Sequence, residues 1–191
     1  MNHFFAYLNR MKYIYRWNLM HSTEQENIME HSLAVGMIAH NLALIGNLYF
    51  QKHYNAERVA LVGMYHESSE VITGDLPTPI KYYNPEIKTA YKELEKIADE
   101  RLLKMLPEAM RPYYESVLCP SPDSDEYRLM KCADKIAAYI KCVEELKAGN
   151  AEFKKAKKSI EKELKGLNCP EADYFCKTFL PSFSLTLDEL D

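Results

Sequence analysis

Apolar residues recur at intervals of three and four along most of the chain, which is the spacing of amphipathic helices. The first such stretch, residues 3–16, carries Phe4, Leu8, Met11 and Tyr15 on one face. The period-two alternation typical of β-strands does not extend over any length, and the sequence shows no internal repeat or low-complexity linker. The pattern therefore predicts an all-α fold.

Capping signals mark where the longer helices begin. Asn27 and Glu30 have the form of a capping box before a helix that runs from residue 28 to about residue 48. Because this helix is apolar on most of its sides, we expect it at the centre of a bundle. Asn55 is expected to cap the next helix, over residues 56–72.

The second half of the chain continues in the same way. Asn84 before Pro85 predicts an N-cap with proline at the first helical position of a long helix. The expected inner face of that helix comprises Ile87, Tyr91, Leu94, Ala98, Leu102 and Met105. Four prolines within residues 107–124 indicate a short broken helix and a surface loop.

The last part of the chain is also expected to be helical. Residues 125–147 have the pattern of a strong helix that ends before Gly149, and a lysine-rich helix begins near Asn150. Shorter helices are expected near residues 170–180 and at the C-terminus. The whole sequence, residues 1–191, is therefore interpreted as one domain, a single helical bundle.

Composition and charge narrow the classes of function. Of 191 residues, 47% are hydrophobic and 27% charged, as in an ordinary globular protein. The net charge of −4 argues against binding of polymeric nucleic acid, which normally requires a basic surplus. The sequence has no run of about 18 apolar residues, so we expect no membrane span. The N-terminus lacks the features of a signal peptide. Five cysteines without a CxxC pair are expected as reduced thiols in a cytoplasmic protein.

Candidate chemistry centres on VGMYHESSEVITGDLPTP, residues 62–79. His66 and Glu67 are adjacent on the predicted helix, and at about 100° per residue both can reach one metal ion. Glu70 lies one turn away, where it can act on a water at that ion, and Asp75 follows in a loop. Two adjacent polar residues on a helix are also common at a solvated edge, so this stretch alone leaves both interpretations open.

Two further polar residues lie on helices that otherwise present apolar faces. His31 is in the first turn of the 28–48 helix, where a lone histidine is commonly hydrogen-bonded or exposed. Asp134 lies at the edge of the apolar stripe of the 125–147 helix, and a buried carboxylate without a partner is costly, so Asp134 is expected to bind a ligand. Arg16 and Trp17, by themselves, are typical of an exposed cation beside a core tryptophan.

Placed in order, His31, His66-Glu67 and Asp134 resemble the His … His-Asp … Asp metal-ligand signature of the HD-domain phosphohydrolases. Longer segments are more specific and look like the bacterial YfbR-type 5'-deoxynucleotidases: EHSLAVGMIAH, AERVALVGMYHESSEVITGDLPTPIKYYN, KCADKIAAYIKCVEELKAGN and FLPSFSLTLDE. The N-terminal HFFAYLNRMKYIYRW fits the same family, so the resemblance covers nearly the whole chain.

This resemblance implies an HD-type helical bundle that uses one divalent ion to remove phosphate from 5'-deoxyribonucleoside monophosphates. His31, His66 and Asp134 match the family's metal ligands, with Glu67 as the fourth candidate, and Glu70 matches the acidic residue that assists the attacking water. Positions at the phosphate, the sugar and the pocket wall are matched by Arg16, Asp75, Trp17 and Thr78. The family is typically dimeric, which implies a homodimer acting on a small-molecule substrate.

One position departs from the family pattern, because Glu67 stands where the family has aspartate. Glutamate keeps the charge and both oxygens, and a different rotamer or a shift of about 1 Å would let it reach the ion. Mixed nitrogen and oxygen ligands suit Mn²⁺, Co²⁺, Fe²⁺ or Zn²⁺.

Two alternatives remain at this point. Because of Glu67, the chain can be a metal-stabilised, non-catalytic module that binds nucleotides or a partner protein. It can also be an HD-type hydrolase of another nucleotide, such as an alarmone or a cyclic dinucleotide, although the match through TGDLPTP argues against this.

Overall fold

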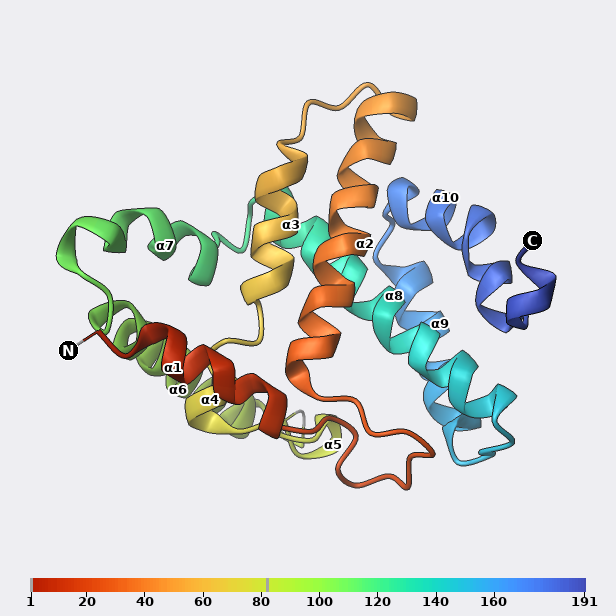
Figure 1. Ribbon diagram of the computed structural model, residues 1–191, viewed down its shortest axis with the longest axis horizontal. Coiled ribbons are helices and arrows are strands. Elements are labelled where there is room, and N and C mark those ends of the chain that lie inside the picture. The colour runs from red at the N-terminus through yellow and green to blue at the C-terminus, as the bar shows by residue number, and fades with distance from the viewer. Residues whose placement is uncertain (1, 82) are drawn as a thin grey trace.

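The computed structural model describes residues 2–81 and 83–191, and Figure 1 shows that helices dominate this part of the chain. The elements are α1 (Phe4–Leu8), η1 (Asn9–Tyr13), α2 (Ile28–Tyr49), α3 (Ala56–Tyr65), α4 (Glu70–Thr73), α5 (Thr78–Lys81), α6 (Pro85–Lys104), η2 (Glu108–Met110), α7 (Arg111–Leu118), α8 (Asp125–Lys147), α9 (Phe153–Gly166), α10 (Pro170–Thr178), η3 (Leu180–Ser184) and η4 (Leu187–Glu189). Within the described ranges there is no strand, only an isolated antiparallel bridge between Tyr15 and Asn27. The predicted all-α fold is confirmed.

The capping box predicted at the start of α2 is present. Asn27 Oδ1 accepts hydrogen bonds from the amides of Met29 and Glu30, both at 3.0 Å, and the Glu30 carboxylate accepts from the Asn27 amide at 3.3 Å. These bonds satisfy amides that a helix start leaves unpaired. They also fix the first turn of α2, where His31 is fully buried.

Helices α2 and α3 pack side by side, and α8 crosses behind both (Figure 1). The close approach of α2 and α3 depends on facing glycines, Gly36 and Gly63. A Cβ atom added at Gly63 would lie 2.9 Å from the Gly36 Cα, so a larger residue there would force the helices apart. This packing brings the start of α2 close to the end of α3.

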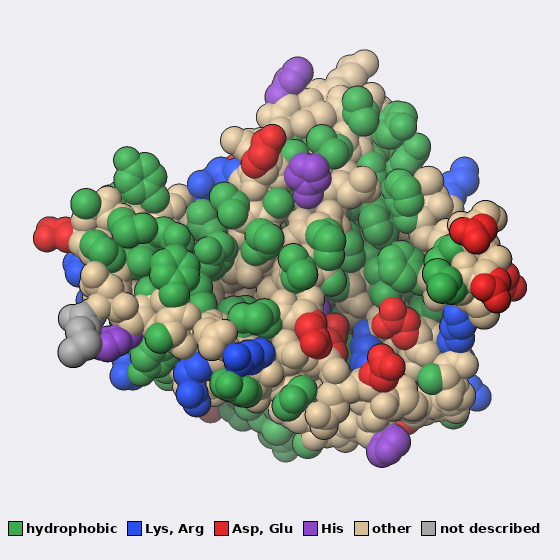
Figure 2. Space-filling model, in the orientation of Figure 1, with side chains coloured by type: hydrophobic (Ala, Val, Ile, Leu, Met, Phe, Trp, Pro, Cys, Tyr) green, Lys and Arg blue, Asp and Glu red, His purple; other side chains and the backbone are tan. Residues whose placement is uncertain are grey.

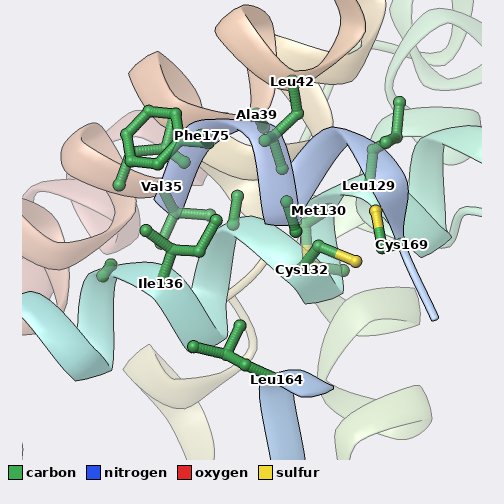
Figure 3. Close-up of a cluster of buried hydrophobic side chains, with 14 of the residues drawn as sticks. Val35, Ala39, Leu42, Leu129, Met130, Cys132, Ile136, Leu164, Cys169 and Phe175 are labelled. Atoms are coloured by element: carbon green, nitrogen blue, oxygen red, sulfur yellow. The ribbon is translucent and has the colours of Figure 1, made fainter. Parts of the chain in front are cut away.

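The main core lies where α2, α8 and α10 meet (Figure 3). Its labelled side chains include Val35, Leu42, Leu129 and Ile136, all of which are fully buried. Cys132 and Cys142 are buried on α8 as small apolar residues, and the described cysteines are free thiols, as expected. This core fixes α8 relative to α2. It thereby sets the position of the polar side chains of one helix relative to those of the other.

Two predicted helices are interrupted in the structure. The helix expected over residues 3–16 is α-helical only to Leu8 and continues as the 3₁₀-helix η1. The helix expected over residues 56–72 ends at Tyr65 and resumes as α4 at Glu70. Ser68 explains this break, because its hydroxyl and its amide both bond to the Tyr65 carbonyl and compete with the helical pattern.

The expectation for α6 was wrong at Leu94, which is 44% exposed. The partners of α6 are α1, α4, α5 and α7, and they cover only the side that carries Tyr91, Ala98 and Leu102. One strongly apolar position of the predicted stripe therefore faces solvent.

The prediction that α2 lies at the centre of a bundle is only partly right. By length and composition alone α2 would pass for a membrane span, but 56% of that stretch is buried inside the molecule, as in a core helix. Its other face exposes Leu33, Met37, Leu44 and Leu48, of which Leu48 is 73% exposed. The centre of the bundle therefore covers one side of α2 and leaves an apolar strip on the other.

Candidate metal centre

Four side chains converge where α2, α8 and the end of α3 meet. His31, His66, Glu67 and Asp134 each place one ligand atom within 4.8 Å of the others. His31 Nε2 lies 3.1 Å from Asp134 Oδ1, and His66 Nε2 lies 3.2 Å from Glu67 Oε1. The structure therefore brings together the four residues that the sequence marked as metal ligands.

The surroundings of His66 suit a metal ligand. Its Nδ1 lies 2.7 Å from the Gly63 carbonyl, which can only accept a hydrogen bond, so Nδ1 carries the proton. The lone pair is then on Nε2, which is buried and makes no hydrogen bond within the described part of the chain. A buried lone pair beside two carboxylates fits a divalent cation, and the two-nitrogen, two-oxygen set suits a transition metal.

The charges at the centre favour cations. Burial opposes ionisation of Asp134, but the hydrogen bond from His31 and the charge of Lys131 outweigh it and hold the pKa of Asp134 well below its ordinary value. For Glu67, burial is likewise outweighed by His66 and Arg16, so the pKa of Glu67 is also well below its ordinary value. Both carboxylates are therefore anionic at neutral pH, as metal ligands must be.

Glu70 is buried at the edge of this centre, in the first turn of α4. Burial and the negative charge of Glu67 raise the pKa of Glu70 to about 11. Its Oε2 has no hydrogen-bond partner among the described residues. The residue proposed to act on a water thus has an unsatisfied oxygen beside the candidate ligands.

Arg16 and Trp17 lie against the same centre. The Arg16 side chain is 15% exposed, and it lies 3.4 Å from Glu67 Oε1. Arg16 is therefore not the exposed cation that the Arg16-Trp17 pair by itself predicts. Trp17 adopts φ = 60°, a left-handed conformation that is costly for a bulky residue, and its ring packs on Phe153 at a centroid distance of 5.3 Å.

The two remaining candidates lie farther out. Asp75 is half-buried after α4, and its pKa is raised by burial despite the opposing charge of Arg16. Thr78 is the first residue of α5 and is exposed, and the hydrogen bonds of the described residues do not link it to the four converging side chains. The structure thus brings Asp75 into the field of the centre, whereas Thr78 has no hydrogen bond to it among the described residues.

Two charged residues of the site were missed by the sequence interpretation. Glu26, at the end of the loop before α2, lies 3.2 Å from Arg16 Nε through its Oε2. Lys131 precedes Asp134 by three residues on α8, a spacing that places both on one helix face. Burial opposes the charge of Lys131, but Asp134 outweighs it and raises the Lys131 pKa.

The loop that carries Trp17 and Glu26 is tied to α8 away from the centre. Glu145, which is 1% exposed, accepts hydrogen bonds from the Thr23 amide at 2.9 Å and from Lys141 Nζ at 2.6 Å. Lys141 also donates to the Glu24 carbonyl at 2.6 Å. These contacts hold residues 23 and 24 and so position the loop over the centre.

Comparison with known proteins gives a consistent result. The family described as "5'-deoxynucleotidase YfbR-like" matches residues 3–183 of the sequence. A 5'-deoxynucleotidase of Vibrio vulnificus is 54% identical over 190 residues, which cover 99% of this chain and 98% of that protein.

Solved structures share the fold. An HD-domain phosphohydrolase from Listeria innocua superposes with a TM-score of 0.81 at 22% identity, covering 94% of this chain and 87% of its own. An HD phosphohydrolase of cyanophage S-2L, solved with dA and one catalytic Zn²⁺, gives a TM-score of 0.67 at 19% identity and covers 95% of this chain and 96% of its own.

Proposed function

This chain belongs to the YfbR-like 5'-deoxynucleotidase family and hydrolyses 5'-deoxyribonucleoside monophosphates, and we propose that His31, His66, Glu67 and Asp134 hold its divalent ion. One observation carries the proposal: four ligand atoms, from α2, α8 and the turn after α3, lie within 4.8 Å of one another. The cyanophage phosphohydrolase of the same fold holds one catalytic Zn²⁺, which supports a metal in this chain. The donor set admits Mn²⁺, Co²⁺, Fe²⁺ or Zn²⁺.

The ion would supply Lewis acidity, lowering the pKa of a water and offsetting charge on the phosphoryl oxygens. Each side chain around the ion is then assigned a separate role. Glu70 is close enough to this centre to orient the attacking water and take its proton. Burial and the charge of Glu67 raise the pKa of Glu70 to about 11 even though the charge of Arg16 opposes them, so Glu70 needs the further positive charge of the ion before it can act as a base.

Arg16 is the residue that would hold the phosphate. Its planar guanidinium already lies 3.4 Å from a candidate metal ligand, Glu67, so a phosphate between the ion and Arg16 would be bound from both sides. A phosphate dianion beside Glu67 and Asp134 would be repelled without these cations. Asp75 is assigned to the sugar, and Trp17 and Thr78 are assigned to the pocket wall.

The molecule is further assigned as one domain that acts as a homodimer in the cytoplasm. The apolar strip of α2 supports self-association, because Leu33, Met37, Leu44 and Leu48 lie on one face of the helix and are exposed. Figure 2 shows apolar side chains gathered over the same region, which includes the exposed Leu61 and Met64 of α3. Free cysteines are consistent with a reducing compartment.

A substrate panel tests the assigned function. Purified protein is freed of metal, and phosphate release is measured with dAMP, dGMP, TMP and AMP after addition of Mn²⁺, Co²⁺ or Zn²⁺. We expect release from the deoxynucleotides, slower release from AMP, and none without metal. A protein that releases no phosphate from any of them with any ion, yet binds one ion, would instead be the non-catalytic nucleotide-binding module.

A further inference from the structure

Glu26 lies directly opposite Arg16 because the backbone pairs the two segments. The Arg16 amide donates to the Glu26 carbonyl at 2.9 Å, and the Ile28 amide donates to the Ile14 carbonyl at 2.9 Å. These bonds flank the bridge between Tyr15 and Asn27. The position of Glu26 is therefore fixed by main-chain bonds on one side and by the cap of α2 on the other.

One oxygen of Glu26 holds the proposed substrate residues. Oε2 accepts from Arg16 Nε at 3.2 Å and from Trp17 Nε1 at 3.0 Å. The Arg16 bond is charge-assisted, and the carboxylate is 17% exposed, so water competes with it only weakly. Because Nε is engaged, the terminal nitrogens of the guanidinium are left to face the centre, where Nη1 already meets Glu67.

The other oxygen of Glu26 faces a proposed metal ligand. Oε1 lies 3.6 Å from His31 Nδ1, an ion-pair distance, and Nδ1 is buried with no hydrogen bond among the described residues. Nε2 bonds to Asp134 at 3.1 Å, and once its proton is lost, a proton kept on Nδ1 and directed at Glu26 would leave the Nε2 lone pair for an ion. Carboxylates in this position orient metal-binding histidines and make them better ligands.

We propose that Glu26 is a positioning residue that sets His31 for the metal and Arg16 for the phosphate, so that a single carboxylate links the two halves of the site. The proposal rests on the proposed function for the role of Arg16, whereas its metal half stands on the geometry of His31 alone. If the proposal is right, loss of Glu26 weakens metal binding and phosphate binding through two separable contacts.

The experiment compares Glu26→Gln, which keeps the shape but removes the charge, with Glu26→Asp, which keeps the charge but withdraws it. Glu24→Gln is the matched control, since Glu24 lies in the same loop and is exposed. Metal affinity is measured by Mn²⁺ titration without substrate. Inhibition by inorganic phosphate and the KM and kcat for dAMP are measured at saturating Mn²⁺, and thermal unfolding is followed with and without Mn²⁺.

For Glu26→Gln we expect Mn²⁺ affinity to fall about 10- to 100-fold, the range for residues that orient a metal-binding histidine. KM for dAMP and the inhibition constant for phosphate should rise even at saturating Mn²⁺, while Glu24→Gln behaves as wild type. In an Arg16→Ala background the added effect of Glu26→Gln on KM should disappear, but its effect on Mn²⁺ affinity should persist.

Wild-type Mn²⁺ affinity in Glu26→Gln and Glu26→Asp would overturn the proposal, whatever the activity. So would a loss of metal and phosphate binding that merely parallels a loss of metal-free thermal stability in both variants. A wild-type protein inactive on every deoxynucleotide would refute the proposed function, and the Mn²⁺ titration would still decide whether Glu26 sets His31. The single tryptophan, Trp17, adds a direct signal, because its emission should change when its Glu26 acceptor becomes an amide.

Discussion

The side chain of Glu70 combines deep burial with an oxygen that has no hydrogen-bond partner in the described structure. A buried polar group without a partner is costly for folding, so Glu70 is not retained for stability. Its removal should therefore separate chemistry from stability.

For Glu70→Gln we expect unchanged metal content and a thermal stability equal to or above that of wild type. Turnover of dAMP should fall about 10²- to 10⁴-fold, the usual contribution of a general base. The measurement is kcat for phosphate release, with Glu57→Gln, an exposed acid on α3, as the control. Near wild-type turnover would show that another residue handles the water.

Glu67 stands where the family resemblance implies an aspartate, and its carboxylate contacts both His66 and Arg16. Glu67→Asp should give a working enzyme with a changed preference among Mn²⁺, Co²⁺ and Zn²⁺. Because the shorter side chain withdraws from Arg16, KM for dAMP should rise modestly. The comparison is kcat and KM with each ion. An inactive parent rescued by Glu67→Asp would place the natural chain among non-catalytic members, because a misplacement of about 1 Å can cost on the order of 10²-fold.

The sequence identified residues on helices better than residues in loops. His66 shares a helical stripe with Val59 and Val62, which predicts that it faces inward, and its side chain is 2% exposed. Glu26 was missed because no periodicity tells which of Glu24, Glu26 and Glu30 turns inward before α2. That choice is made by the backbone pairing with residues 14–16, a contact that local pattern does not contain.

At the level of elements, helix starts were predicted well because each has its own local signal. The side chains of Asn27, Asn55 and Asn84 all accept amide hydrogen bonds as N-caps. The break between α3 and α4 was not predicted, because it depends on Ser68 bonding back to Tyr65 rather than on periodicity. The break places Glu67 in the turn between the two helices and Glu70 in the first turn of α4, next to the four converging side chains.

The attachment of residues 23 and 24 to α8 gives a prediction about how the free energy of unfolding depends on pH. Burial opposes the charge of Glu145, but Lys141, Thr23 and Asn150 outweigh it and lower its pKa to about 2. A depressed pKa stabilises the fold above the unfolded value of about 4.5, and this contribution is lost as pH falls from there toward 2. Glu145→Gln should thus cost on the order of 2–3 kcal/mol at pH 7 and progressively less below pH 4.5.

Urea unfolding of wild type and Glu145→Gln at pH 7, 5 and 3 measures this difference, with the exposed Glu152→Gln as control. The gap between wild type and Glu145→Gln should narrow only at the lowest pH. A gap that stays constant from pH 7 to pH 3 would mean that the charge of Glu145 does not hold the loop.

At the scale of the whole molecule, the apolar strip of α2 is the main difference from the predicted bundle. A helix apolar on most sides was expected at the centre, but the bundle covers one side only. A second copy of the chain is a simple way to cover the rest, because an exposed strip of this kind is typical of an interface.

Substitution of Met37, which is 61% exposed in this strip, should reveal the interface. Met37→Glu would place a charge in an apolar contact between two copies, so the protein should become a monomer. Leu187→Glu, at a residue 82% exposed on η4, should leave the dimer intact. Light scattering after size-exclusion chromatography gives the mass, and a monomeric wild type or a dimeric Met37→Glu would contradict the assignment.

The most direct test of the account is a metal titration of activity. Metal-free protein receives Mn²⁺ in fractions of an equivalent, and phosphate release from dAMP is recorded at each step for wild type and for Asp134→Asn. If His31, His66, Glu67 and Asp134 hold one ion, activity in the wild type rises and levels off at one ion per chain. Asp134→Asn should show no such plateau. Full activity without metal, a plateau at two ions per chain, or a wild-type titration in Asp134→Asn would contradict the account.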